Sequence, residues 1–183
     1  MEEIKRYSIE ELEELGEEFS GSSKMVYVVG DYVYKFDLDD YYSEDTANLK
    51  NESEKYLKKV LSYRSKEELK EIYPSQLYSE LHTWLIIDEK FKRCLCPIVD
   101  YYIDKTVGLI CVMPNLTTLR EEKFLNDYEE IWEYDSTYDE EIESFKKDIV
   151  DLERDYGFDS RELGLLFNIG TYQDRIVSID YGR

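Results

Sequence analysis

The sequence predicts an α+β fold in which a small antiparallel sheet is combined with separate helices. Two pairs of β-rich runs are each joined by a tight polar turn, Gly30-Asp31 in the first pair and Asp104-Lys105 in the second. Short polar turns between such runs are typical of β-hairpins. Elsewhere, apolar residues recur at intervals of three and four, which is the periodicity of an amphipathic helix. We therefore expect a five-stranded antiparallel sheet with one helix packed on it, followed by a reduced and mainly helical second part.

Length and charge restrict the classes of protein to which the chain could belong. Its 183 residues suffice for one domain or two small lobes, and 18 tyrosines and 7 phenylalanines supply bulk for a packed core. A net charge of −20 repels nucleic acid and anionic membranes, so we expect direct binding to neither and a protein partner with a basic surface. The same net charge would also fit a surface that is only solvated, or a protein that imitates the charge of DNA. No run approaches the roughly 18 consecutive apolar residues of a membrane span.

The cysteines and the first residues indicate a cytoplasmic protein. Cys94, Cys96 and Cys111 form no disulfide framework, and with the single histidine, His82, they make a poor zinc-binding set. The opening Met-Glu-Glu-Ile-Lys-Arg lacks the apolar run of a secretory signal. We therefore expect reduced thiols and a cytoplasmic location.

Local signals place the elements of the first part of the chain. Ser8-Ile-Glu-Glu11 is a capping box that opens a short helix, and residues 25–36 form the first hairpin. Before this hairpin, the small-residue turn around Gly21 could leave backbone N–H groups free to meet phosphate. Lys35, in the second run, shares a strand face with Val33, so it either extends from an edge into solvent or points into a cleft.

Helices then separate the two hairpins. Residues 46–63 and 75–91 have helical spacing, and a capping box at Ser65 starts a further helix that Pro74 interrupts. We interpret His82, inside the second of these stretches, as a packing or surface histidine. The hairpin of residues 96–113 follows.

The second part of the chain is predicted to be helical up to a final hairpin. We expect a helix over residues 119–134 and another, capped at Thr137, that ends at Gly157. A final hairpin has arms at 166–169 and 176–179.

Two oxygen-bearing side chains flank this final hairpin. Asn168 precedes the turn and Asp180 follows it, so pairing of the arms brings them close. Amide and carboxylate oxygens suit Mg²⁺, although a plain hairpin with polar ends would have the same pattern.

The order Asn, strand, turn, strand, Asp-Tyr-Gly resembles the metal-binding half of a protein kinase-like active site. The glycine-bearing turn, the hairpin and the Val-Tyr-Lys run ending at Lys35 resemble the N-lobe of the same superfamily. The resemblance implies that Asn168 and Asp180 hold Mg²⁺ and that Lys35 meets the phosphates of ATP. It also implies that a helical glutamate orients Lys35, for which Glu54 is the candidate and Glu52 the alternate.

The resemblance extends to further ligand contacts and to the division of the chain. Gly21 would lie in the loop over the phosphates, and the backbone from Met113 to Leu116, with Asn115 among these residues, would face an adenine. A minimal two-lobed kinase-like fold is implied, with an N-lobe of residues 1–114 that has a helical insertion at about 65–92, and a reduced C-lobe of residues 115–183.

The sequence departs from the family where the catalytic base belongs. The residue five positions before Asn168 is Leu163, which cannot accept a proton, and Glu162 and Asp159 are the nearest substitutes. The family's fuller glycine-rich loop is absent, and the given sequence ends at Arg183, before any activation segment.

Three functions follow from this resemblance and these departures. The first is a pseudokinase that acts mainly by protein binding, with ATP and Mg²⁺ optional. The second is a small atypical ATP-dependent phosphotransferase. The third is an acidic, phage-type inhibitor that imitates DNA.

Overall fold

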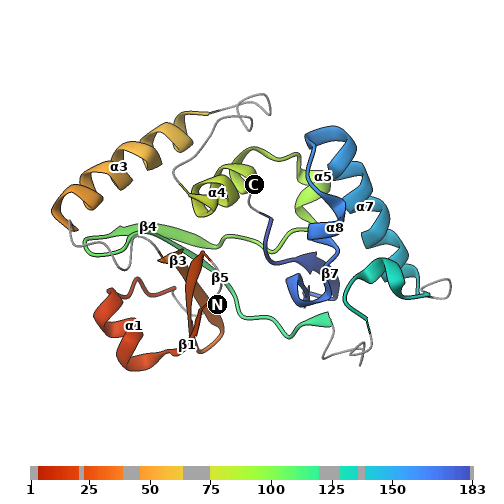
Figure 1. Cartoon of the computed structure of the whole chain (residues 1–183), viewed down its shortest axis with the longest axis horizontal. Coiled ribbons are helices and arrows are strands. Elements are labelled where there is room, and N and C mark those ends of the chain that lie inside the picture. The colour runs from red at the N-terminus through yellow and green to blue at the C-terminus, as the bar shows by residue number, and fades with distance from the viewer. Residues whose placement is uncertain are drawn as a thin grey trace. The chain divides into compact units, whose positions relative to one another are not determined.

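The computed structural model describes residues 4–20, 23–38, 46–63, 75–119, 128–135 and 139–181, with the side chains of residues 46 and 47 excepted (Figure 1). The chain forms two compact units. The first unit contains the residues up to Ile86 and then Pro97–Asn115, and the second contains Ile87–Cys96 and Leu116–Tyr181. No helix in the described ranges is both long and apolar enough to cross a membrane.

The first unit is built on an antiparallel sheet of five strands in the order β1-β2-β3-β5-β4, which confirms the expected sheet and both of its hairpins. The strands are β1 (Glu17–Ser20), β2 (Lys24–Val29), β3 (Tyr32–Asp37), β4 (Asp100–Asp104) and β5 (Gly108–Pro114). Gly30, in the turn between β2 and β3, has a positive φ of 60°, a conformation that glycine adopts at little cost.

One face of this sheet carries the apolar core of the first unit. Met25, Tyr27 and Phe36 point to this face and pack with Leu12 of the helix α1 (Ile9–Leu15). The rings of Tyr27 and Phe36 stack with their centroids 6.0 Å apart. The capping box that starts α1 is present as predicted, with Ser8 and Glu11 as its two members.

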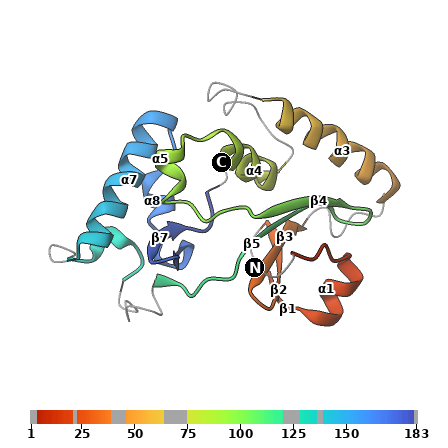
Figure 2. The same cartoon turned by 180° about the vertical axis from the view of Figure 1, so that it is seen from behind.

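The other face of the sheet meets two longer helices, α3 (Thr46–Ser62) and α4 (Gln76–Ile86). Figures 1 and 2 show α1 on one side of the strands and these two helices on the other. His82 lies in α4 with no exposed surface, and its ring is 4.8 Å from that of Tyr63, in keeping with a packing role.

The helix predicted over residues 75–91 is two helices. α4 ends at Ile86, and a separate short helix, α5 (Glu89–Lys92), belongs to the second unit. The backbone of Asp88 is extended, and its N–H donates to the hydroxyl of Tyr156 at 3.2 Å instead of continuing the helix. The expected insertion at 65–92 is therefore divided between the units, and its part from 64 to 74, with Ser65 and Pro74, lies outside the described residues.

The main helix of the second unit is α7 (Glu140–Tyr156), which ends as predicted at Gly157 in the left-handed conformation. Its buried face includes Ile142, Phe145, Ile149 and Leu152. Its N-cap is Asp139, which accepts a hydrogen bond from the backbone of Ile142, whereas Thr137 lies outside the described residues.

The helix predicted over 119–134 does not continue to its end. Its last described part is a 3-10 helix, Ile131–Glu133, preceded by Glu130 in extended conformation. The carboxylate of Glu133 accepts from the backbone N–H of Glu129 at 2.9 Å, so the side chain caps a new helix at this point.

The chain then passes through α8 (Ser160–Leu163) and a 3-10 helix, Leu166–Asn168, into the final hairpin, β6 (Ile169–Tyr172) and β7 (Arg175–Ser178). The hairpin is confirmed, but its first arm starts at Ile169 because residues 166–168 are helical. Its turn residues, Gln173 and Asp174, have positive φ values of 50° and 59°, as two-residue hairpin turns require.

Candidate functional site

Charged side chains are buried on the helix-covered face of the sheet in the first unit. We call Lys24, Lys35, Asp37 and Glu80 the buried charge cluster. The pairing of β2 with β3 brings these side chains together, because residues opposite each other lie on the same face. Lys24 lies opposite Asp37 and Val26 lies opposite Lys35, so both lysines share one face of the sheet. Glu80 reaches this face from α4.

Glu80 is shared by the two lysines. Lys24 Nζ donates a hydrogen bond to Glu80 Oε1, and Lys35 Nζ lies 3.8 Å from Glu80 Oε2. The side chains of both lysines are 7% exposed and that of Glu80 is 0% exposed. An unpaired charge at such depth costs several kcal/mol, so opposite charges must meet for the cluster to be tolerated.

Cys111 borders this cluster from β5, directly across from Lys35. Its thiol is fully buried; desolvation and then the nearby Glu80 carboxylate raise its pKa well above the ordinary value. The thiol therefore stays protonated and behaves as a packing group rather than as a nucleophile.

The structure corrects the predicted partner of Lys35. Glu54 lies on α3 with its side chain 44% exposed, 4.0 Å from Lys50, one turn away on the same helix. The carboxylate beside Lys35 is instead that of Glu80, because α4 carries an acidic residue toward the strands. A sequence signal for Glu80 existed: it stands between Leu77 and Leu81, on the buried side of an apolar helix.

The residues expected to contact a nucleotide base lie at the end of β5. Met113 is buried opposite Val33, whereas Asn115 is exposed and donates its backbone N–H to the carbonyl of Asp31 at 2.8 Å. That N–H is therefore engaged within the first unit. Gly21, the expected phosphate-loop residue, lies outside the described residues.

In the second unit, the backbones of the two expected metal ligands are neighbours. The N–H of Ile179 donates to the carbonyl of Asn168 at 2.7 Å, so Asp180 follows one residue after this contact. Both side chains are half-buried. In the described ranges, no group of three or more His, Cys, Asp or Glu side chains could hold a metal ion. The donor types still suit Mg²⁺, which commonly takes its remaining ligands from water and phosphate.

The substitutes for a catalytic base lie at α8. Leu163 is 2% exposed, while Glu162 is exposed at the end of the helix. Asp159 is the N-cap and accepts from the backbone N–H of Arg161 at 2.9 Å. This hydrogen bond, reinforced by the guanidinium of Arg161, lowers the pKa of Asp159. A carboxylate with a lowered pKa is a weaker base, so the geometry does not favour Asp159 in that role.

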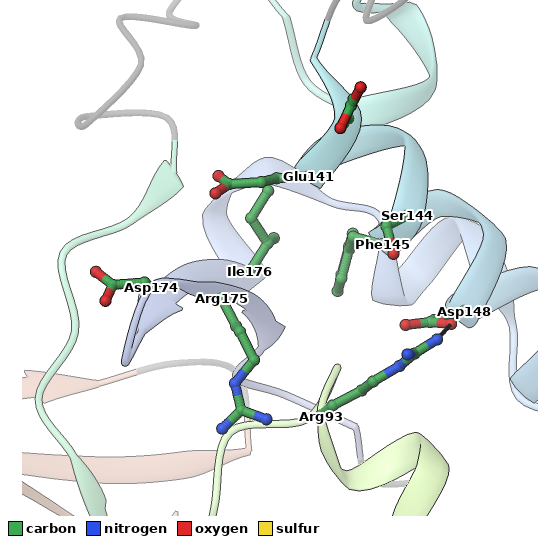
Figure 3. Close-up of a pocket in the computed structure, with 9 residues that line it drawn as sticks. Arg93, Glu141, Ser144, Phe145, Asp148, Asp174, Arg175 and Ile176 are labelled. Atoms are coloured by element: carbon green, nitrogen blue, oxygen red, sulfur yellow. Dashed lines mark hydrogen bonds and ion pairs between the residues drawn. The ribbon is translucent and has the colours of Figure 1, made fainter.

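A hollow of about 350 Å³ lies between α7 and β7 in the second unit; we call it the α7–β7 hollow (Figure 3). The buried side chains of Phe145 and Ile176 supply its apolar lining. Arg93 reaches in from the end of α5 and pairs with Asp148 at 2.5 Å, where the side chain of Asp148 is only 9% exposed. This site was not predicted from the sequence, although Asp148 stands among the inward-facing residues of α7.

The charges around the α7–β7 hollow are predominantly negative. Four carboxylate residues line it, and only two arginines, Arg93 and Arg175, offset them. The carboxylates belong to Glu140, Glu141, Asp148 and Asp174. A cationic group therefore suits the hollow better than an anionic one.

Comparison of the chain with protein-family models, with curated proteins and with solved structures finds no match. The class defined by the coordinates is an α+β protein with a five-stranded antiparallel sheet and several helices.

Proposed function

We propose that this chain is a kinase-like domain that acts by binding another protein rather than by transferring phosphate. The observation that carries the proposal is the ion pair between Lys35 and Glu80. Lys35 lies on the third strand of the antiparallel sheet, and Glu80 lies on the helix α4. In protein kinases, a lysine of the third strand pairs with a helical glutamate and meets the ATP phosphates. Glu80 takes the role for which the sequence suggested Glu54.

The region before Asn168 favours binding over catalysis. Phosphoryl transfer to a hydroxyl needs a side chain that accepts its proton. Leu163 stands where this base belongs and is buried, and Asp159 already caps a helix. The second unit keeps Asn168 and Asp180, whose amide and carboxylate oxygens suit Mg²⁺, so a magnesium-bound nucleotide is an optional ligand of the proposed domain.

The partner is inferred from charge. The chain has a net charge of −20, and the α7–β7 hollow combines an apolar lining with an acidic rim. The aliphatic stem of an arginine or lysine side chain fits such a lining while its charged end meets carboxylates. A protein with a basic surface is therefore the proposed partner.

The test combines turnover with nucleotide binding. Phosphate release from Mg-ATP, and phosphate transfer to protein acceptors, are measured for the wild-type chain and for Lys35→Met, with background rates expected from both. The melting temperature with Mg-ATP is measured in parallel, because a ligand at 100 times its Kd adds about 2.7 kcal/mol to stability. A rise that Asp180→Ala abolishes identifies a nucleotide site without turnover. Turnover by the wild type that Lys35→Met removes would replace this proposal with an atypical phosphotransferase.

The high negative charge also supports a second candidate, an acidic inhibitor that imitates DNA. Competition with duplex DNA for a cationic DNA-binding protein, measured at low and at physiological ionic strength, separates the two. Mimicry predicts competition that falls steeply as salt rises, because exposed charges are then screened. An absence of competition at low salt would exclude the mimic.

A further inference from the structure

Three tyrosines of the first unit line a second, smaller hollow. Tyr32 and Tyr34 alternate along β3 and so point to the same face of the sheet, and Tyr7 comes from the segment just before α1. Together with Asp31, Lys5 and Val29 they line a space of about 170 Å³, which we call the tyrosine hollow. The hollow is on the α1 side of the sheet, the face opposite the buried charge cluster.

Two of the three rings are fixed in position. The hydroxyl of Tyr34 donates to the backbone carbonyl of Lys5 at 2.9 Å, and Tyr34 itself is 1% exposed, so it forms the floor of the hollow. The ring of Tyr7 stands 5.5 Å from that of Tyr34 at an interplanar angle of 69°. The two rings therefore make an edge-to-face contact. Tyr7 and Tyr32 are half-buried and remain accessible.

This lining favours a cation whose charged centre is surrounded by apolar groups. The face of an aromatic ring carries partial negative charge, which attracts a cation within about 6 Å of its centroid. Asp31, exposed in the turn between β2 and β3, adds a full negative charge at the rim. The hydroxyl of Tyr34 is already engaged and its ring is almost fully buried, so the accessible ring surface is that of Tyr7 and Tyr32. Lys5 brings one positive charge to the same lining.

We propose that the tyrosine hollow binds a quaternary methylammonium group. Methyl groups pack against rings and need no hydrogen bonds, while the permanent charge interacts with the ring faces and with Asp31. A space of about 170 Å³ is smaller than a drug-sized pocket, so it suits one headgroup rather than an extended ligand. This site is independent of the proposed kinase-like function, because it shares no residue with the buried charge cluster.

The test is a titration followed by NMR chemical shifts, using choline and 3,3-dimethylbutanol, in which carbon replaces the charged nitrogen. We expect choline to bind at least about fivefold more tightly than its neutral counterpart. Tyr32→Ala is expected to weaken choline binding about two- to fivefold, whereas Tyr32→Phe, which keeps the ring, leaves it unchanged. Lys5→Ala should strengthen binding, because it removes a like charge. Tyr101→Ala, a half-buried tyrosine of β4 outside the hollow, is the control with no expected effect.

A peptide with one trimethylated lysine distinguishes the two natural sources of this group. Tighter binding of the peptide than of choline assigns the site to a modified protein, and the reverse order assigns it to a small molecule. Equal binding of choline and the neutral alcohol would overturn the proposal, as would unchanged choline affinity in a Tyr32→Ala variant that melts at the wild-type temperature. Binding of neither choline nor the peptide would overturn it as well.

Discussion

Glu80 is the residue on which the buried charges of the first unit depend. Its carboxylate contacts both Lys24 and Lys35, and all three side chains are at least nine-tenths buried. Removal of one member from a buried ionic group leaves an uncompensated charge, which costs more than the pair contributed. The stability of this unit is therefore sensitive to a single carboxylate.

Glu80→Gln is expected to destabilise the protein by about 3 to 5 kcal/mol, because it leaves two ammonium groups buried without this carboxylate. The free energy of unfolding from urea titration measures the effect. Glu54→Gln is the matched control on α3: Glu54 is 44% exposed, so a change below about 1 kcal/mol is expected. Equal costs for the two variants would contradict the role given to Glu80.

Glu80 could not be predicted from the sequence as the partner of Lys35. Lys35 was recognised from its local pattern, because a strand and its alternation are encoded within a few residues. Its partner was not, since the choice between Glu54 on α3 and Glu80 on α4 depends on which helix covers the strands. Leu77 and Leu81 beside Glu80 were the available clue, because an acidic residue on a buried helix face needs a buried cation.

At the scale of elements, the local sequence predicted the hairpins, the capping box of α1 and the end of α7, whereas the end of α4 lies beside a long-range contact. Gly30-Asp31 and Gly157 act through their own backbone conformations and were predicted correctly. α4 ends at Ile86, and two residues later the N–H of Asp88 donates to the hydroxyl of Tyr156, 68 residues away in sequence. No local pattern contains such a contact.

The segment before α1 is held to β4 by a two-pronged ion pair. Arg6 Nε and Nη2 donate to the two carboxylate oxygens of Asp100, each at 2.8 Å. This hydrogen bonding to Arg6 lowers the pKa of Asp100. Arg6 also lies over the ring of Tyr102, with its guanidinium carbon 5.7 Å from the ring centroid. The pair thus links the first residues of the unit to an edge strand of its sheet.

The contribution of the Arg6–Asp100 pair to the free energy of unfolding should disappear at acidic pH. Because the folded-state pKa of Asp100 is lowered, its stabilisation is fully present above the unfolded value of about 3.9 and is lost as the pH falls through the folded value. Arg6→Ala is expected to cost about 1 kcal/mol at pH 7, limited by the 60% exposure of Arg6, and less at strongly acidic pH. Urea titrations at both pH values measure the difference. A cost independent of pH would assign it to packing on Tyr102 instead.

At the scale of the whole molecule, the charge of −20 favours encounter with any cation, so specificity must come from where the carboxylates lie. The α7–β7 hollow places Glu141 and Asp174 beside an apolar lining (Figure 3). Exposed glutamates of α1, such as Glu13 and Glu14, contribute the same charge without such a hollow.

Glu141→Lys with Asp174→Lys is expected to weaken binding of an oligo-arginine peptide more than Glu13→Lys with Glu14→Lys. Each acid-to-lysine change adds two charges, so both double variants change the net charge from −20 to about −16. Fluorescence anisotropy with a labelled peptide, at two ionic strengths, measures the affinities. An equal loss in the two variants would show that total charge alone attracts the peptide.

The assignment of Ile87–Cys96 to the second unit has a consequence for the order of events during synthesis. The N–H of Cys96 pairs with the carbonyl of Ser178, and its own carbonyl accepts from Tyr181, 85 residues further on. At about 5 to 20 residues per second, these partners leave the ribosome several seconds after Cys96 does. The first unit can complete its sheet in that interval, whereas the second must wait for Ser178 and Tyr181. A fragment that starts at Leu116 would lack Leu95, which bridges to Ser178 at the end of β7. A continuous piece that holds the second unit must therefore start at Ile87 and include Pro97–Asn115 of the first unit.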